Sequence, residues 1–167
     1  LLFLIQEQCL LTLIQRWEKS GNRRENVRAR IRTFVKNHLG FFFHNMHEMK
    51  VMSHEADSLT DKFQEKLQHL KRRYVKVLTN LILELQQEEG GKGMDARVAT
   101  FSLFGMMNWI YTWYHPKRDL PLSELIEQML RICFYGVIKG AKVQEPWVVS
   151  STSDTGKESF SLWNNQS

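Results

Sequence analysis

Cysteine and long apolar runs are scarce in this sequence. Cys9 and Cys133 are its two cysteines and neither belongs to a CxxC pair, which argues against a disulfide framework and favours buried, reduced thiols in a cytosolic protein. No apolar stretch approaches the ~20 residues that a membrane-spanning helix needs. The opening LLFLI runs directly into Gln6 and Glu7, without a basic lead-in or a small-residue cleavage site, so we do not interpret it as a signal peptide.

The usual catalytic motifs are also missing. Nothing resembles GxSxG, and Val51 instead of a second histidine stands four residues after His47, so HExxH is absent. The glycine run 90–93 is not a phosphate loop, because Gln86 occupies the position of the earlier glycine and Gly93 follows Lys92. A nucleophile needs an identifiable base and orienter, and none is apparent. We therefore expect no enzyme, no catalytic residue and no cofactor.

Strand-like alternation is absent too, whereas apolar residues recur throughout at steps of three and four. The pattern predicts an all-α chain of about six helices. Asn22, Asp95 and Ser123 are the expected N-caps of the second, fifth and sixth helices. The expected helical segments are 1–19, a second one from the region of Val27 to 43, 44–56, 58–88, 95–115 and 123–138.

The length and composition indicate one domain. With 167 residues and 43% hydrophobic content, the chain can bury a sizeable core. We expect a helical domain over 1–143 and a poorly structured polar tail over 144–167. The net charge of +5 does not by itself establish nucleic-acid binding. The basic cluster between Arg16 and Lys36 is interpreted as a solvated outer face, with an anion site as the alternative.

The last two predicted helices are apolar on nearly every side. Such helices must be buried on every side, so part of their surface should face a partner or a ligand. Within 106–114, Asn108 places an amide among bulky apolar side chains, where it needs a hydrogen-bond partner. We interpret this region as lining a ligand cavity, with plain core packing as the alternative. Arg72 and Arg73, beside Tyr74, could reach the mouth of such a cavity.

Three histidines call for a separate interpretation. His44, His47 and His54 fall on one helical face with Glu48 and Glu55 nearby, a workable ligand set for a metal ion. Helical spacing alone is weak evidence, and we favour polar residues that partly line a cavity. No metal ion is therefore expected.

The stretch 95–136 carries a resemblance to a known family. FGMMNWIYTWYHP, a short turn, LSELIEQ and a helix reaching FYGV resemble the final two helices of TetR-type transcriptional regulators, in the branch that includes sensors of fatty acyl-CoA. The long helix with Arg72-Arg73-Tyr74 also fits, and the resemblance extends from residue 1 to about 140. It implies a six-helix regulatory domain whose last two helices form a four-helix-bundle interface in a homodimer. No helix-turn-helix lies in these residues, so operator DNA would be bound through an N-terminal domain absent from this chain.

The resemblance also implies a mechanism. A small apolar ligand such as an acyl-CoA would bind in the pocket, change the spacing of the two DNA-binding heads and release the operator, without chemistry. The alternatives are a helical interaction or scaffold domain without a small-molecule ligand, and an enzyme that uses the histidine cluster. We expect ligand contacts from Phe34, His38, Phe42, Phe63, Leu70, Arg73, Tyr74, Met106, Asn108, Trp109 and Trp113. We expect dimer contacts from Phe101, Phe104, Ile110, Met129, Cys133, Phe134 and Val137.

Overall fold

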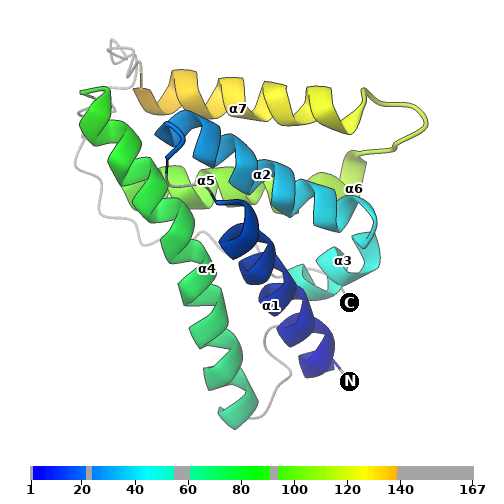
Figure 1. Cartoon of the computed structure of the whole chain (residues 1–167). Coiled ribbons are helices and arrows are strands. Elements are labelled where there is room, and N and C mark those ends of the chain that lie inside the picture. The colour runs from blue at the N-terminus through cyan, green and yellow to red at the C-terminus, as the bar shows by residue number, and fades with distance from the viewer. Residues whose placement is uncertain (1, 22–23, 55–60, 91–93, 139–167) are drawn as a thin grey trace, which may run out of the picture.

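The computed structural model describes residues 2–21, 24–54, 61–90 and 94–138 (Figure 1). Within these ranges the chain forms helices joined by turns, with no strand, and the predicted all-α architecture is confirmed. None of the described helices is long and apolar enough to cross a membrane. The predicted tail 144–167, and the last part of the predicted domain from 139 to 143, lie outside the described residues.

The helices follow the predicted segments, except that the predicted fifth helix is split into two. Trp109 interrupts the expected fifth helix, which becomes a longer and a four-residue helix in succession. The elements are α1 (Leu2–Ser20), α2 (Val27–Phe43), α3 (Met46–His54), α4 (Asp61–Glu88), α5 (Ala96–Asn108), α6 (Ile110–Trp113) and α7 (Leu122–Ile138).

The helix ends confirm one predicted cap and correct two. The side chain of Asp95 accepts hydrogen bonds from the backbone N–H groups of Arg97 and Val98, as a cap should. The cap of α2 is Asn26, whose Oδ1 accepts from the Ala29 N–H at 2.8 Å, so the prediction of Asn22 was wrong. Ser123 is also not a cap, because α7 already begins at the preceding residue.

The helices surround one central core. Figure 1 shows α7 crossing the top of the molecule beside α2, with α5 behind α2, while α1 and α4 descend together. Phe34 of α2 is fully buried in this core and stacks on Tyr74 of α4, with ring centroids 4.8 Å apart. Trp17 and Phe104 each pack edge-on with Phe34. This aromatic cluster ties α1, α2, α4 and α5 together, and aromatic pairs add to the stability that their buried area provides.

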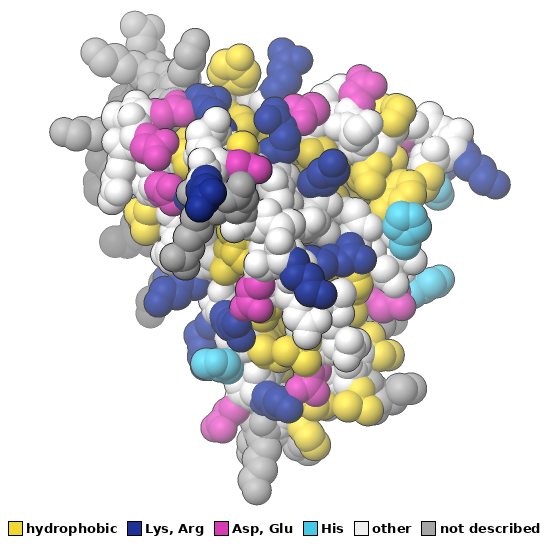
Figure 2. Space-filling view, viewed as in Figure 1, with side chains coloured by type: hydrophobic (Ala, Val, Ile, Leu, Met, Phe, Trp, Pro, Cys, Tyr) yellow, Lys and Arg dark blue, Asp and Glu magenta, His cyan; other side chains and the backbone are white. Residues whose placement is uncertain are grey.

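Ion pairs join helices on the outer surface. Figure 2 shows Lys and Arg side chains interspersed with Asp and Glu over this face. Arg32 of α2 binds Glu127 of α7 through two hydrogen bonds of 2.8 Å, and Arg28 of α2 binds Glu89. Carboxylates from outside α2 therefore pair with Arg28 and Arg32 on the predicted solvated basic face of this helix. The further pairs are Arg30–Glu84, Arg73–Glu18 and Lys66–Glu7.

The two cysteines are buried free thiols, as predicted. Burial is the main cause that raises the pKa of each thiol to about 11, and Glu48 adds to the effect at Cys9. A thiol with so high a pKa is almost entirely protonated near neutral pH and is a poor nucleophile. Neither cysteine is therefore suited to covalent chemistry.

Candidate ligand-binding cavity

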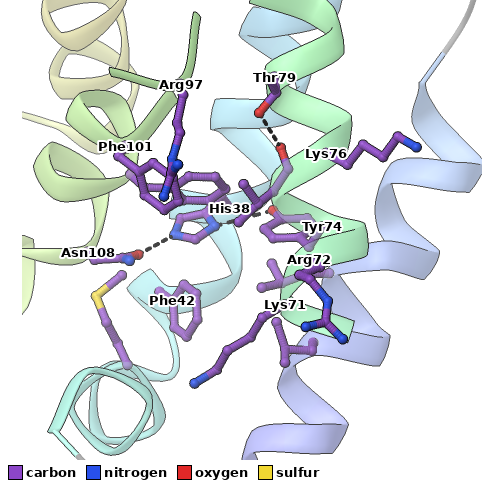
Figure 3. A pocket seen from close by; sticks show the side chains of 15 residues that line it. His38, Phe42, Lys71, Arg72, Tyr74, Lys76, Thr79, Arg97, Phe101 and Asn108 are labelled. Carbon is purple, nitrogen blue, oxygen red and sulfur yellow. Dashed lines mark hydrogen bonds between the residues drawn. The ribbon is translucent and has the colours of Figure 1, made fainter. Parts of the chain in front are cut away.

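A cavity of about 630 Å³ lies between α1, α2, α3, α4 and α5. Its volume falls within the range of about 300–1,000 Å³ that is usual for small-molecule sites. The walls are mostly aromatic and aliphatic, with a few polar groups and several cations. The fifteen lining residues, shown in Figure 3, are Leu10, Leu13, His38, Phe42, Met49, Lys71, Arg72, Tyr74, Val75, Lys76, Thr79, Arg97, Phe101, Phe104 and Asn108.

His38 occupies the centre of the cavity wall. Figure 3 shows Asn108 and Tyr74 on opposite sides of its ring. The Nε2 atom lies 3.0 Å from Oδ1 of Asn108, and Nδ1 lies 3.2 Å from the Tyr74 hydroxyl. Burial lowers the pKa of His38 to about 4, although the hydrogen bond to Asn108 opposes this shift. Burial also raises the pKa of Tyr74. Both rings are therefore neutral near pH 7.

Cations border the cavity without acidic neighbours in its lining. Lys71, Arg72 and Lys76 come from α4 and Arg97 from α5, and none of the fifteen lining residues is acidic. Among the described residues, Arg72, Lys76 and Arg97 have no carboxylate within ion-pair distance. Arg97 instead lies over the ring of Phe101, 5.8 Å from its centroid. The border of this apolar cavity therefore carries uncompensated positive charge, which suits an anion.

The structure brings four of the predicted ligand residues together at this cavity. His38, Phe42, Tyr74 and Asn108 line it directly. Phe34 and Leu70 are buried in the core and do not belong to the lining.

The other predicted ligand residues lie elsewhere. Phe63 is half exposed and packs on Phe3, with ring centroids 4.6 Å apart. Arg73 points to the outer surface, where it pairs with Glu18. Met106, Trp109 and Trp113 belong to a second hollow, outside the cavity.

The second hollow, of about 480 Å³, lies between α5, α6 and α7. The described residues that line it are apolar except for one glutamine, and none of them is charged. Trp109 and Ile132 are about 60% exposed there, which leaves a large apolar surface uncovered in a single copy of the chain. The residues that line it are Gly105, Met106, Trp109, Trp113, Leu125, Gln128, Met129 and Ile132.

The predicted dimer contacts are distributed over three environments. Met129 lines the second hollow, whereas Phe101 and Phe104 line the cavity. Ile110, Cys133 and Phe134 are already buried within one copy, and the Phe134 ring lies 4.8 Å from the Arg28 guanidinium. The side chain of Val137 lies outside the described residues.

Sequence reasoning missed a large share of the cavity lining. Phe101 and Phe104 had been assigned to the dimer interface. The lining residues that were not selected for either role, apart from Arg72, are Leu10, Leu13, Met49, Lys71, Val75, Lys76, Thr79 and Arg97. A signal was present on α4, where Lys71, Val75 and Thr79 follow one another at steps of four beside Tyr74. This row borders the apolar stripe, so Lys71 can bury its stem and keep its charge at the cavity border. The sequence analysis had considered Arg72 for this position together with Arg73, and only Arg72 lines the cavity.

The histidine cluster shows no metal site among the described residues, in which no group of three or more potential ligands converges. Nδ1 of His44 instead donates to the Gly40 carbonyl at 3.2 Å. The side chain of His54 lies outside the described residues.

Comparison with known proteins identifies the family. The sequence profile of the tetracyclin repressor-like C-terminal domain matches residues 24–137, well over half of the chain. The chain belongs to this family. No curated protein matches the chain in sequence.

Solved structures of TetR-family regulators share this C-terminal fold. The regulator PfmR from Thermus thermophilus is 20% identical, with a TM-score of 0.68 over 79% of this chain and 72% of its own. A TetR-family regulator from Bordetella parapertussis is 22% identical, with a TM-score of 0.71 over 79% and 69% of the two chains. AibR, solved in complex with isovaleryl coenzyme A and operator DNA, is 22% identical, with a TM-score of 0.66 over 82% and 72%.

Proposed function

We propose that this chain is the effector-sensing and dimerisation domain of a cytoplasmic TetR-type repressor, and that its cavity binds an acyl thioester of coenzyme A. The observation that carries the proposal is the combination of an apolar cavity with three border cations, Arg72, Lys76 and Arg97, that no described carboxylate pairs with. Such a site fits a ligand with an apolar chain at one end and phosphates at the other. The similarity to AibR, which was solved with isovaleryl coenzyme A, supports the same ligand class.

The second hollow provides the dimer contact in this proposal. Its apolar surface, with Trp109 and Ile132 largely exposed, would pack against the same surface of a second copy in a two-fold arrangement. We therefore move the proposed interface from buried residues such as Ile110 and Cys133 to the exposed side of α5, α6 and α7. These helices also carry Val98 and Tyr135 as exposed apolar groups.

In the proposed mechanism the ligand acts by differential binding. Operator DNA would be bound through an N-terminal helix-turn-helix that precedes these residues, and no bond in the ligand is made or broken. The cavity is formed by α1, which would connect to that DNA-binding head, and by α5, which belongs to the proposed interface. A ligand that contacts both helices can favour one arrangement of the two heads over another.

Native mass spectrometry tests the proposal with a panel of probes. Isovaleryl-, decanoyl- and palmitoyl-CoA are compared with the free fatty acids and with coenzyme A itself. We expect a dimer that takes up one thioester per subunit and binds the free acids less tightly. A chain that binds none of these probes would contradict the proposal and would favour the interaction or scaffold function.

A charge variant with a matched control sharpens this test. Replacing Arg72 and Lys76 together by glutamine should weaken decanoyl-CoA binding by about tenfold at low salt, because two charge-assisted contacts to phosphate are lost. Arg73→Gln removes the neighbouring charge, which Glu18 already neutralises outside the cavity, and should change the affinity by less than about twofold. An equal effect on the binding free energy for each charge removed would show that only net charge matters, contrary to a phosphate site at the cavity border.

A further inference from the structure

The hydrogen-bonding groups inside the cavity can be assigned one by one. Oδ1 of Asn108 is a carbonyl oxygen and can only accept, so the Nε2 atom of His38, 3.0 Å away, must carry the hydrogen and donate. The neutral imidazole then has no hydrogen on Nδ1. The Tyr74 hydroxyl, 3.2 Å from Nδ1, is therefore the donor in the second hydrogen bond. The direction of this chain fixes the tautomer of the buried histidine.

The hydroxyl hydrogen of Thr79 is also already engaged and is not available to a ligand. Its hydroxyl donates to the Val75 carbonyl at 3.1 Å. The Thr100 hydroxyl lies 3.1 Å from it, but the single hydrogen of Thr100 is closer to the Ala96 carbonyl, at 2.6 Å. The donors of His38, Tyr74 and Thr79 are thus all engaged within the protein.

The amide nitrogen of Asn108 is different. This side chain is half-buried, lines the cavity, and makes one hydrogen bond among the described residues, through its oxygen. Because that oxygen is held by His38, the NH₂ group keeps two donors that no described residue satisfies. Phe42 and Phe104, which also line the cavity, offer no acceptor in their side chains. Among the described residues, the Asn108 amide is the one uncharged side-chain donor of the cavity lining that is left for a ligand.

We infer that Asn108 recognises a carbonyl oxygen of the ligand inside the apolar part of the cavity, with His38 and Tyr74 as positioning residues. This inference rests on the proposed function and deepens it, since it assigns the donor that reads the acyl group. A ligand whose chain is purely hydrocarbon leaves the amide unsatisfied on binding, and this desolvation lowers its affinity. The cavity therefore selects acyl compounds over alkyl compounds of equal length.

Two probes that differ in this one oxygen test the inference. Decanoyl-CoA has the thioester carbonyl, and S-decyl-CoA is the thioether with the same chain and the same phosphates. We expect the unaltered chain to bind decanoyl-CoA about tenfold more tightly in isothermal titration calorimetry. Equal affinities would overturn the inference and leave the sensor function intact, whereas no binding of either probe would overturn both.

Variants locate the selectivity at Asn108. Asn108→Asp keeps an oxygen that accepts from His38 but has no amide donor, and should abolish the preference for decanoyl-CoA. Asn108→Leu, which removes both groups, should also bind the two probes equally. Thr79→Val removes a hydroxyl of the same cavity that is already engaged, and should keep the tenfold preference. Since each preference is a ratio measured on one variant, a loss of stability cancels, and a preference that survives both Asn108 changes would overturn the assignment.

Discussion

The two hollows of this domain are both apolar, yet they differ in charge and in access to polar groups. The first hollow is the candidate ligand-binding cavity, which lies among five helices and combines aromatic walls with a buried histidine and a cationic border. The second lies on the outer side of α5, α6 and α7 and is lined by exposed tryptophan and isoleucine without any charge. Polar groups inside a hollow select a ligand by its hydrogen-bonding atoms, whereas an uncharged surface excludes water against any complementary apolar face. In the proposed function, α5 would therefore take part in two kinds of recognition, through Asn108 in the first hollow and through Met106 in the second.

The largest expected effect comes from a charge placed in the second hollow, which should disrupt the dimer without changing ligand binding in the cavity. Ile132→Glu places a carboxylate in the proposed interface on both copies and removes two apolar side chains. The dissociation constant of the dimer should rise by about a thousandfold or more, because each buried carboxylate would lack a partner. Analytical ultracentrifugation measures this change, and calorimetry should find decanoyl-CoA affinity within about threefold of the original.

Leu83→Glu is the matched control for this variant. Leu83 of α4 is another exposed apolar residue, 42% accessible, but it lines neither hollow. We expect its dimer to remain intact. If both variants dissociate, or if neither does, the interface does not lie at the second hollow.

Much of the fold was predictable because it depends on periodicity. The three–four spacing in 61–88 predicted α4, and Asp95 predicted the start of α5, since both are local properties of the sequence. Asn26 was overlooked as the cap of α2 because Asn22 has the same chemistry and stands four residues earlier. A choice between two equivalent caps depends on where the preceding turn ends, which is not a local property.

The candidate site was predictable only in part. Asn108 was selected because a polar group on an apolar helix face needs a partner, and the structure places it in contact with His38, another predicted ligand residue. The distinction between Arg72 and Arg73 could not be drawn, because it depends on Glu18 of α1, which lies far away in the sequence. Similarly, the burial of Ile110 and Cys133 within one copy results from the packing of α6 and α7 against the rest of the domain. An apolar helix face does not by itself reveal whether its own chain or a second copy covers it.

The next largest effect is the pH dependence of the free energy of unfolding that His38 causes at the centre of the first hollow. Burial lowers the pKa of His38 from 6.5 to about 4, so the unfolded chain binds a proton over this range that the folded chain does not. The free energy of unfolding should therefore decrease as the pH falls from 6.5 to about 4, and this histidine should contribute about 3 kcal/mol to the decrease. Urea unfolding at several pH values gives the free energy of unfolding as a function of pH for the original chain and for His38→Gln. The difference between the two slopes measures the contribution of His38.

His69→Gln controls for the loss of a histidine as such. His69 lies exposed on α4, so this variant should retain the full decrease of the original chain. A His38→Gln variant with an unchanged slope would mean that the histidine becomes protonated without unfolding. The cavity would then admit a charge at its centre, contrary to the neutral tautomer on which the assignment of Asn108 depends.

The smallest expected effect concerns a second amide, which contrasts with Asn108. Gln6 of α1 is fully buried, and neither its oxygen nor its nitrogen has a hydrogen-bond partner among the residues that the structure describes. It continues the row of Leu10 and Leu13 one turn further along α1, beyond the residues that line the cavity. Asn108 is half-buried and keeps its oxygen bonded, so its free donors can serve a ligand, whereas Gln6 bears the full cost of desolvation without such access.

Gln6→Met should therefore stabilise the domain. Methionine has a similar length and flexibility but no amide to desolvate, so the free energy of unfolding should rise by about 1 kcal/mol. Urea unfolding at pH 7 measures this rise, and decanoyl-CoA affinity should stay the same because Gln6 does not line the cavity. A loss of stability would mean that the amide is satisfied in solution. A loss of affinity at unchanged stability would mean that the ligand site extends along α1. The amides of both Gln6 and Asn108 would then contact the ligand.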